Sequence, residues 1–259
     1  MRWGVFALAT LTALLVAGLG LMATELRDVG GQARVEVAPG IVAVATGKSY
    51  AYVLRGDTGV VLVDAGSDSD ARGILEELAR TKQSAADIHA VFITSPHPFT
   101  VAGLDALRDA PVYLGEGDEA LVRGSSVVRA PIARLWSRLH ARKKRDNPLQ
   151  PVLAGARIVI DGIAIEAVAT PGVSNGGRSY ITRETAFVGP AFAMHDGKLA
   201  TPSFWLVDHR EHLRVTLQRL GGHAFGAIAG STFTPHGDGH ALYLAWEANI
   251  PESERLPKP

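Results

Sequence analysis

Short β-rich runs and amphipathic segments alternate along most of this chain, and this alternation restricts the folds open to it. Residues 88–93 are almost all apolar, which predicts a strand buried on both faces. Before them, residues 70–81 carry Ile74, Leu75 and Leu78 at helical spacing and predict an amphipathic helix. Because each sheet needs helices to cover its apolar faces, the pattern predicts a mixed α and β fold with two stretches of sheet.

Turn residues divide the other apolar runs into short strands and hairpins. Pro39-Gly40 breaks the first run, and Asp161-Gly162 is the expected turn of a later hairpin. The other predicted elements, in chain order, are a first strand over 35–44, strands over 50–54 and 59–63, a hairpin over 157–168, a strand pair over 179–182 and 185–188, a helix over 209–220 and a buried strand over 224–229.

The composition excludes several classes of protein. Hydrophobic residues make up 47% of the 259 residues and charged residues 20%, so a mainly disordered chain is excluded. The 26 Lys and Arg residues balance the 26 Asp and Glu residues, which argues against a partner that is a nucleic acid. The chain has no cysteine, which excludes disulfide scaffolds, zinc fingers and thiol catalysis.

We expect residues 1–24 to form an amino-terminal membrane anchor, a transmembrane helix. The 21 residues from Trp3 to Ala23 contain no charge, and a helix of that length spans about 30 Å, the thickness of a hydrocarbon core. A cleaved signal peptide is the alternative, although its apolar run is normally about 7–15 residues long. With Arg2 before the span, we expect a single-pass protein whose linker, residues 25–35, leads to a domain on the non-cytoplasmic (periplasmic) side.

Six short motifs follow one another between residues 61 and 230. They are Val61–Gly66, Val91–Thr94, Val101–Leu104, Ala169–Gly172, Ala186–Gly189 and Ile228–Gly230. Their order and spacing resemble those of the metallo-β-lactamase fold superfamily. The resemblance implies a four-layer αββα sandwich over residues 36–250, with two central sheets face to face and helices outside. Residues 251–259 are then a tail.

Members of that superfamily usually bind zinc or iron, which activates a water for hydrolysis of esters, thioesters, lactams or phosphodiesters. The family's ligand motif is Thr-His-x-His-x-Asp-His after a buried strand, and here residues 94–100 read Thr-Ser-Pro-His-Pro-Phe-Thr. By the resemblance, seven positions correspond to metal ligands, and only His97 keeps a ligating side chain. These positions are Ser95, His97, Phe99, Thr100, Val173, Pro190 and Ser231.

The substitutions at these positions are not alternative ligands. A catalytic divalent metal needs about three protein ligands, with a further position open for water. Phe99 and Val173 are apolar, and the side chain of Pro190 has no donor atom. We therefore expect a metal site that has been filled instead of rebuilt, with no cofactor and no catalytic residue.

The polar residues that remain near these positions have simpler structural roles. We expect His97 to hydrogen-bond within its loop, with Pro98 holding its backbone extended. We expect Asp64 to cap the turn at Ala65-Gly66. In the family, the position of Asp64 helps to orient the groups around the metal.

Histidines farther along the chain are weak alternative ligands. His236 and His240 are separated by two glycines and Asp238, which predicts a flexible turn that is poorly suited to hold a metal. Asp208 is expected to be the N-cap of the helix that follows it, which leaves His209 and His212 in solvent.

Residues 129–145 predict a basic amphipathic helix, inserted between the two halves of the sandwich. The segment has seven basic residues and no acidic one, and Trp136 lies on an apolar stripe at helical spacing. A solvated charged face is one interpretation, and contact with anionic lipid or with a membrane protein complex is the other. The residues expected to make that contact are Arg134, Trp136, Arg138, Arg142, Lys143, Lys144 and Arg145.

Two functions remain open from the sequence. The first is a membrane-anchored, catalytically inactive member of the superfamily that acts as a binding or structural accessory subunit of a membrane-associated assembly. The alternative is a metal-dependent hydrolase, with zinc in a rearranged or single-metal site around Asp64, His97, His236 and His240. The missing ligands at positions 99, 173 and 190 favour the first.

Overall fold

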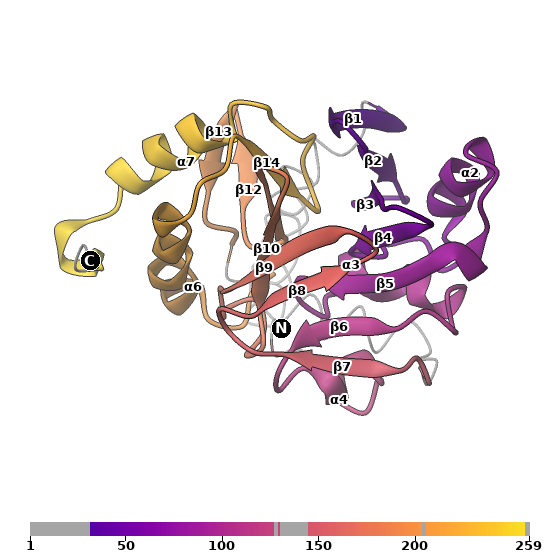
Figure 1. Cartoon of the computed structure of the whole chain (residues 1–259). Coiled ribbons are helices and arrows are strands. Elements are labelled where there is room, and N and C mark those ends of the chain that lie inside the picture. Colours follow the sequence, from indigo (N-terminus) through magenta and orange to yellow (C-terminus); the bar gives the residue numbers. More distant parts are fainter. Residues whose placement is uncertain (1–31, 127–128, 130–144, 204–205, 257–259) are drawn as a thin grey trace, which may run out of the picture.

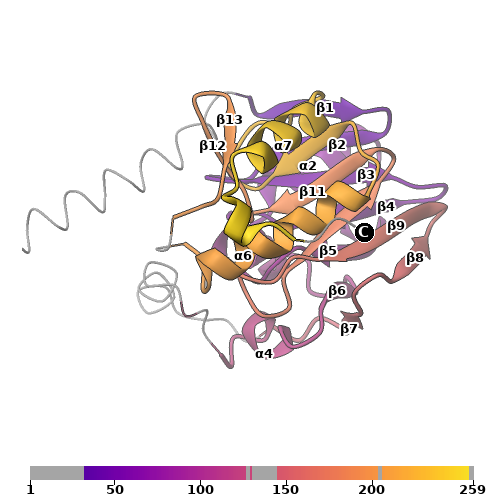
Figure 2. The same ribbon diagram turned by 90° about the vertical axis from the view of Figure 1, so that its left-hand side faces the viewer.

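The computed structural model describes residues 32–126, 129, 145–203 and 206–256. Two sheets lie face to face, with helices on their outer sides (Figures 1 and 2). The predicted anchor at residues 1–24 lies outside the described residues, as do most of the linker and of the basic segment. Within the described part, no helix is long and apolar enough to cross a membrane.

The first sheet has seven strands that follow one another in chain order. The strands from β1 to β4 pair antiparallel through short turns, and β5, β6 and β7 are then added in parallel. Its strands are β1 (Arg34–Ala38), β2 (Ile41–Ala45), β3 (Tyr50–Arg55), β4 (Val60–Val63), β5 (Ile88–Ile93), β6 (Val112–Gly115) and β7 (Leu149–Val152). The helices of this half are α2 (Arg72–Arg80), η2 (Ala85–Asp87), α3 (Pro98–Val101), η3 (Ala102–Asp105) and α4 (Glu119–Val122).

The second sheet has five strands in the order β14, β11, β10, β9 and β8, of which β14 and β11 are parallel. Its strands are β8 (Arg157–Ile160), β9 (Ile163–Ala169), β10 (Arg178–Thr182), β11 (Thr185–Gly189) and β14 (Ala227–Gly230). A separate hairpin joins β12 (Ala193–His195) to β13 (Lys198–Ala200). The helices of this half are α6 (Arg210–Leu217), η4 (Gln218–Gly222), α7 (Gly239–Ala248) and η5 (Glu252–Glu254).

Three apolar cores separate the layers, and the alternation of side chains along each strand fills them. On β2, Ile41 and Ala43 point into the core between the two sheets, whereas Val42 and Val44 point into the core under α2. The third core lies between the second sheet and the helices α6 and α7. The layers therefore run helix, sheet, sheet, helix, and the mixed α and β prediction is confirmed.

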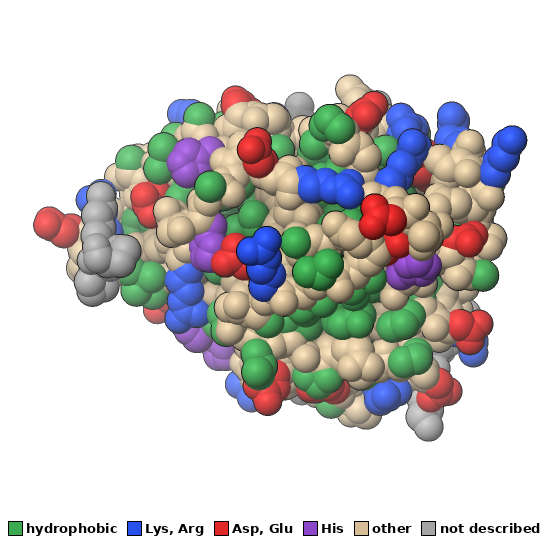
Figure 3. Space-filling model, viewed as in Figure 1, with side chains coloured by type: hydrophobic (Ala, Val, Ile, Leu, Met, Phe, Trp, Pro, Cys, Tyr) green, Lys and Arg blue, Asp and Glu red, His purple; other side chains and the backbone are tan. Residues whose placement is uncertain are grey.

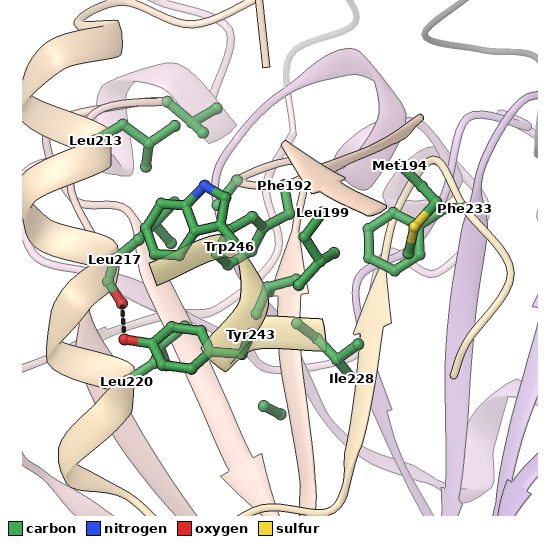
Figure 4. Packing of buried hydrophobic residues seen from close by; sticks show 14 of the residues in the cluster. Phe192, Met194, Leu199, Leu213, Leu217, Leu220, Ile228, Phe233, Tyr243 and Trp246 are labelled. Atoms are coloured by element: carbon green, nitrogen blue, oxygen red, sulfur yellow. Dashed lines mark hydrogen bonds between the residues drawn. The ribbon is translucent and has the colours of Figure 1, made fainter. Parts of the chain in front are cut away.

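The third core is built largely from aromatic and leucine side chains, and Figure 4 shows its packing. Leu213 and Leu217 of α6 face Tyr243 and Trp246 of α7. The Trp246 ring meets the Phe192 ring edge-on, at a centroid distance of 4.8 Å. This packing seats both helices on the second sheet, and two of the former ligand positions, Phe99 and Val173, belong to the same core.

Several predicted elements differ from the structure at their ends. The first predicted strand is two strands, because Pro39-Gly40 forms the turn of the β1–β2 hairpin, with φ of 75° at Gly40. The helix expected over 209–220 is α-helical only to Leu217 and continues as a 3₁₀ helix. The strand expected from residue 224 begins at Ala227, after Gly226.

The surface of the described residues carries charges of both signs. On the face shown in Figure 3, acidic and basic side chains are interspersed, as the balanced composition leads one to expect. Large hydrophobic side chains are exposed at Leu75, Leu153, Val159, Leu244 and Leu256. Of these, Leu244 belongs to α7, the helix whose inner face fills the third core.

Candidate functional site

The loops that carry the former ligand positions meet where the two sheets come together at one edge of the sandwich. Arg178, at the start of β10, donates its backbone N–H to the Thr94 carbonyl at 2.8 Å. Ser231, after β14, donates its backbone N–H to the Gly189 carbonyl, also at 2.8 Å. At Gly189, a side chain would clash, because a Cβ there would lie 2.0 Å from the Thr94 hydroxyl oxygen.

Asp64 lies at the centre of this junction and is fully buried. Thr94 donates its backbone N–H and its hydroxyl to the Asp64 carboxylate, at 2.9 to 3.0 Å. Ser231 donates its hydroxyl to the same carboxylate at 3.3 Å. The backbone of Asp64 is left-handed, with φ of 58°, which places the side chain between the loops of the two sheets.

The expectation that Asp64 caps the turn at Ala65-Gly66 is therefore wrong. Its carboxylate bonds to residues 30 and 167 positions away in the chain. Burial raises the pKa of Asp64 to about 7, and the hydrogen bonds from Thr94 and Ser231 oppose that rise. The residue orients the loops around the site, which is the role that the family resemblance implies for its position.

His97 is the N-cap of α3, and its backbone is extended as the following proline predicts. Its ring Nδ1 accepts the backbone N–H of Phe99 at 3.3 Å, and its own backbone N–H is donated to the Thr100 hydroxyl oxygen at 3.1 Å. The Thr100 hydroxyl in turn donates to the carbonyl of Ser95. The prediction that His97 hydrogen-bonds within its loop is confirmed.

The chemistry of His97 follows from these contacts. Because Nδ1 accepts a hydrogen bond, the neutral ring carries its proton on Nε2. Burial lowers the pKa of His97 to about 4, so the ring is neutral at physiological pH. The Nε2 atom and the Ser95 hydroxyl are buried, and neither has a hydrogen-bond partner among the described residues.

Apolar side chains occupy the space around the His97 ring. Phe99 lies beside it at a ring-centroid distance of 4.8 Å and is 7% exposed. Val173 and Pro190 are also buried. The cavity that remains has a volume of about 10 Å³, room for at most one water molecule. Its lining residues are His97, Phe99, Pro190, Phe192, Ala193, Pro202, Leu206 and Thr232.

The residues present here do not fit the metal centre that the fold family implies. His97 uses one ring nitrogen as a helix cap, and its neighbours at the former ligand positions are hydrocarbon or hydroxyl side chains. Ser and Thr hydroxyls are poor zinc ligands beside imidazole and carboxylate. In the part of the chain that the structure describes, no three His, Cys, Asp or Glu side chains are grouped so that they could hold a metal ion.

The weak alternative ligands, His236 and His240, both contact neighbouring parts of the fold. His236 pairs with Ile228 in an isolated β-bridge, and its ring lies 3.8 Å from the carboxylate of Asp238. His240 belongs to the first turn of α7, where its ring packs edge-on against Phe225. The expected turn is present at residues 237–238, between the bridge at His236 and the start of α7.

Two further predictions concern the start of α6 and the basic segment. His209, not Asp208, is the N-cap residue of α6, and both His209 and His212 are exposed. Of the predicted contact residues 134–145, only Arg145 is described, and the others lie outside the described residues. Arg145 forms an ion pair with Asp105 at 2.8 Å, and its side chain is 16% exposed.

One buried polar network was missed by the sequence analysis. Asp118 accepts the Ser174 hydroxyl at 2.6 Å and the Gly176 backbone N–H at 3.0 Å, which joins the start of α4 to the loop after β9. Burial raises the pKa of Asp118 to about 6. Arg178 lies close by and donates to the Val152 carbonyl at 3.2 Å. No motif connects these residues, because their spacing in the chain has no regular pattern.

Comparison with known families agrees with this geometry. The sequence model of the metallo-beta-lactamase superfamily matches residues 44–246. The chain belongs to the metallo-β-lactamase superfamily. Among curated proteins, none matches this superfamily member by sequence.

Solved structures of metallo-β-lactamases share this fold. A metallo-β-lactamase family protein of Thermus thermophilus has a TM-score of 0.60 at 20% identity, over 81% of this chain and 79% of that one. BJP-1, a subclass B3 metallo-β-lactamase of Bradyrhizobium japonicum, has a TM-score of 0.59 at 20% identity, over 86% and 84%. A B3 enzyme described as the first with an active site glutamic acid has a TM-score of 0.65 at 16% identity, over 86% and 88%. At these identities the similarity shows the fold alone.

Proposed function

We propose that this metallo-β-lactamase superfamily member is catalytically inactive and acts as a binding or structural accessory subunit of a membrane-associated assembly. In this proposal, residues 1–24 anchor the chain as a single-pass protein, with its domain on the periplasmic side. The basic segment 129–145 provides the contact with a membrane protein complex or with anionic lipid.

The observation that carries the proposal is the apolar filling of the former metal site. Phe99 and Val173 are members of the third core, where burial of each stabilises the fold by roughly 1.5–3 kcal/mol. A charged ligand or a metal-bound water at these positions would have to displace that packing. The former metal site of this chain therefore stabilises the fold, at the position where other members of the family carry out hydrolysis.

The electrostatics of the remaining groups support the same interpretation. His97 is neutral, has one nitrogen committed to α3, and lies against the Phe99 ring. Asp64 is enclosed by Thr94 and Ser231, and its side chain has no solvent exposure. Both side chains are buried, whereas a general base must come within hydrogen-bond reach of the proton that it removes.

Metal content tests the proposal directly. The purified full chain is incubated with excess zinc, iron or manganese, dialysed and measured by elemental analysis, beside a His97→Ala control. We expect each metal to remain far below one equivalent in both proteins, because a single imidazole cannot provide the ligands that a catalytic metal needs. About one metal per chain that is lost in the His97→Ala protein would refute the proposal.

The alternative, a metal-dependent hydrolase, rests on one specific observation. The Nε2 atom of His97 has no partner in the described part of the chain, and it belongs to a position that is a ligand in the family. Under this alternative, His97 contributes a single ligand to a zinc site that is completed by other residues. Zinc-dependent hydrolysis of an activated ester or a β-lactam by the wild type, absent from the His97→Ala protein, would favour it.

A further inference from the structure

The loop between β9 and β10 contains the pair Asn175-Gly176, whose two residues have opposite environments. Asn175 is exposed, and its side chain makes no hydrogen bond to any described residue. Gly176 is buried, and both polar groups of its backbone are held. Its N–H is donated to the Asp118 carboxylate at 3.0 Å, and its carbonyl accepts from the Arg178 guanidinium, also at 3.0 Å. A free side-chain amide therefore lies next to a fixed backbone nitrogen.

Close packing explains why residue 176 is a glycine. A Cβ on Gly176 would lie 2.6 Å from the carboxyl carbon of Asp118 and 2.6 Å from the carbonyl oxygen of Gly115. In the reverse direction, a Cβ on Gly115 would lie 1.6 Å from the Gly176 carbonyl oxygen. The fold thus requires a residue without a side chain directly after Asn175.

A glycine in that position favours a reaction in which the asparagine side chain loses ammonia. The backbone nitrogen of Gly176 gives up its proton and attacks the side-chain carbonyl carbon of Asn175. A C–N bond forms, the bond from that carbon to the amide nitrogen breaks, and ammonia leaves with the proton. Water then opens the cyclic imide to aspartate or to isoaspartate, whose main chain is longer by one carbon. Glycine permits the attack because it has no Cβ to crowd the nitrogen.

The other two asparagines of the chain lack this combination of features. Asn147 is buried, its side chain donates to the Leu107 carbonyl at 2.7 Å, and the proline that follows it has no backbone N–H. Asn249 donates its side-chain amide to the Ala245 carbonyl at 2.7 Å, and the residue after it is the β-branched Ile250. The reaction is therefore expected at Asn175 and not at the other two.

We propose that Asn175 is a site of spontaneous deamidation and that Asp118 sets its rate by holding the attacking nitrogen. To react, the Gly176 nitrogen has to move toward the Asn175 side chain and lose its proton, and either change breaks the hydrogen bond to Asp118. A carboxylate is too weak a base to remove the proton of a peptide N–H, so this hydrogen bond restrains the reaction.

The charge of Asp118 strengthens the restraint. Burial raises the pKa of Asp118 to about 6, so the carboxylate is ionised in neutral solution. A hydrogen bond from a backbone N–H to a charged carboxylate is stronger than one between neutral groups. Opening of the Gly176 peptide group therefore carries the cost of a charge-assisted hydrogen bond.

The modification would act on a loop that also contributes to the third core through Val173. Either product adds a negative charge between Ser174 and Gly176, which both donate to the Asp118 carboxylate. Like charges that lie close together disfavour each other. Isoaspartate also lengthens the main chain between these two donors. We therefore expect deamidation to loosen the contact between this loop and α4.

Mass spectrometry of tryptic peptides measures the reaction, because trypsin places the three asparagines in separate peptides. The full chain is incubated at pH 8, with and without guanidinium chloride. We expect aspartate and isoaspartate to accumulate at Asn175, and not at Asn147 or Asn249. The reaction should be faster in the denaturant, because unfolding releases Gly176 from Asp118.

Substitution of Asp118 tests its role in the folded protein. Asp118→Ala should deamidate at Asn175 about tenfold faster than the wild type, since a hydrogen bond to a charged group is lost. Asp118→Asn keeps a neutral acceptor and should react at an intermediate rate. Glu116→Ala removes an exposed carboxylate from the same turn and is the matched control, with the rate of the wild type. Circular dichroism establishes which variants are folded.

Three results would overturn the proposal. The first is a reaction at Asn175 that is no slower in the folded wild type than in guanidinium chloride. The second is a rate at Asn175 that the folded Asp118 variants leave unchanged; if Asp118→Ala does not fold, Asp118→Asn decides this point. The third is a reaction at Asn249 as fast as that at Asn175. The inference does not depend on the proposed function, because the reaction needs only this chain and water.

Discussion

The ionisation of Asp64 leads to a quantitative prediction for stability. The carboxyl is fully buried, and its pKa rises to about 7 in the folded protein from the ordinary value of 3.8 for a solvated group. Between these two pH values the folded state holds a proton that the unfolded state has released. Stability therefore falls as pH rises through this window and is constant above it.

The size of the effect follows from the shift in pKa. One unit of pKa corresponds to about 1.4 kcal/mol, so the charged form of Asp64 lowers the free energy of unfolding by about 4 kcal/mol at pH 8 relative to pH 4. In the Asp64→Asn variant the side chain keeps its shape and stays neutral. We therefore expect this variant to match the wild type at pH 4 and to be more stable than the wild type at pH 8.

The assay is urea unfolding of the full chain, followed by circular dichroism at intervals from pH 4 to pH 8. Burial of Asp118 and of His97 also contributes to the pH dependence, but both groups are present in the two proteins, so they cancel in the difference. Asp57→Asn, at an exposed position, is the control and should leave the difference flat. A flat difference for Asp64→Asn as well would refute the reasoning, since it would mean that burial does not perturb this carboxyl.

Three other predictions follow from the structure. Phe99→Ala should lower the free energy of unfolding by about 3 kcal/mol, which is the typical loss when a large aromatic side chain is removed from a core. Urea unfolding measures this change. If the free energy of unfolding is unchanged, the former metal site is not part of the core. The full chain should stay with membranes after a high-salt wash, because salt weakens electrostatic adsorption but not the insertion of a transmembrane span. If the protein is soluble and amino-terminal sequencing shows that it begins near Thr24, residues 1–23 are a cleaved signal instead. Reversal of charge at Arg138, Arg142 and Lys144 to Glu should release membrane partners in co-purification without unfolding the domain, and equal recovery from wild type and variant would contradict the contact. Arg145→Glu is the companion change that should lower stability, because Arg145 pairs with Asp105.

Local patterns in the sequence were enough to predict most of the secondary structure and to show which of the family's ligand positions have no ligating side chain. The apolar run at residues 88–93 is β5, and the predicted hairpin around Asp161-Gly162 joins β8 to β9. Both could be predicted because hydrophobic periodicity and turn-forming residues act over only a few positions of the chain. The identities of Phe99, Val173 and Pro190 excluded these three side chains as metal ligands without any knowledge of their positions in space, because they have no donor atoms.

Only the tertiary structure decided what the remaining polar groups do. Asp64 is bonded to Thr94 and Ser231, and Asp118 to Ser174, across 30, 167 and 56 positions of the chain. The exposure of Leu244 likewise depends on how Tyr243 and Trp246 of α7 pack in the third core. The physical reason is that burial and hydrogen bonding depend on distances in space, and elements far apart in the chain become neighbours only when the two sheets pack together.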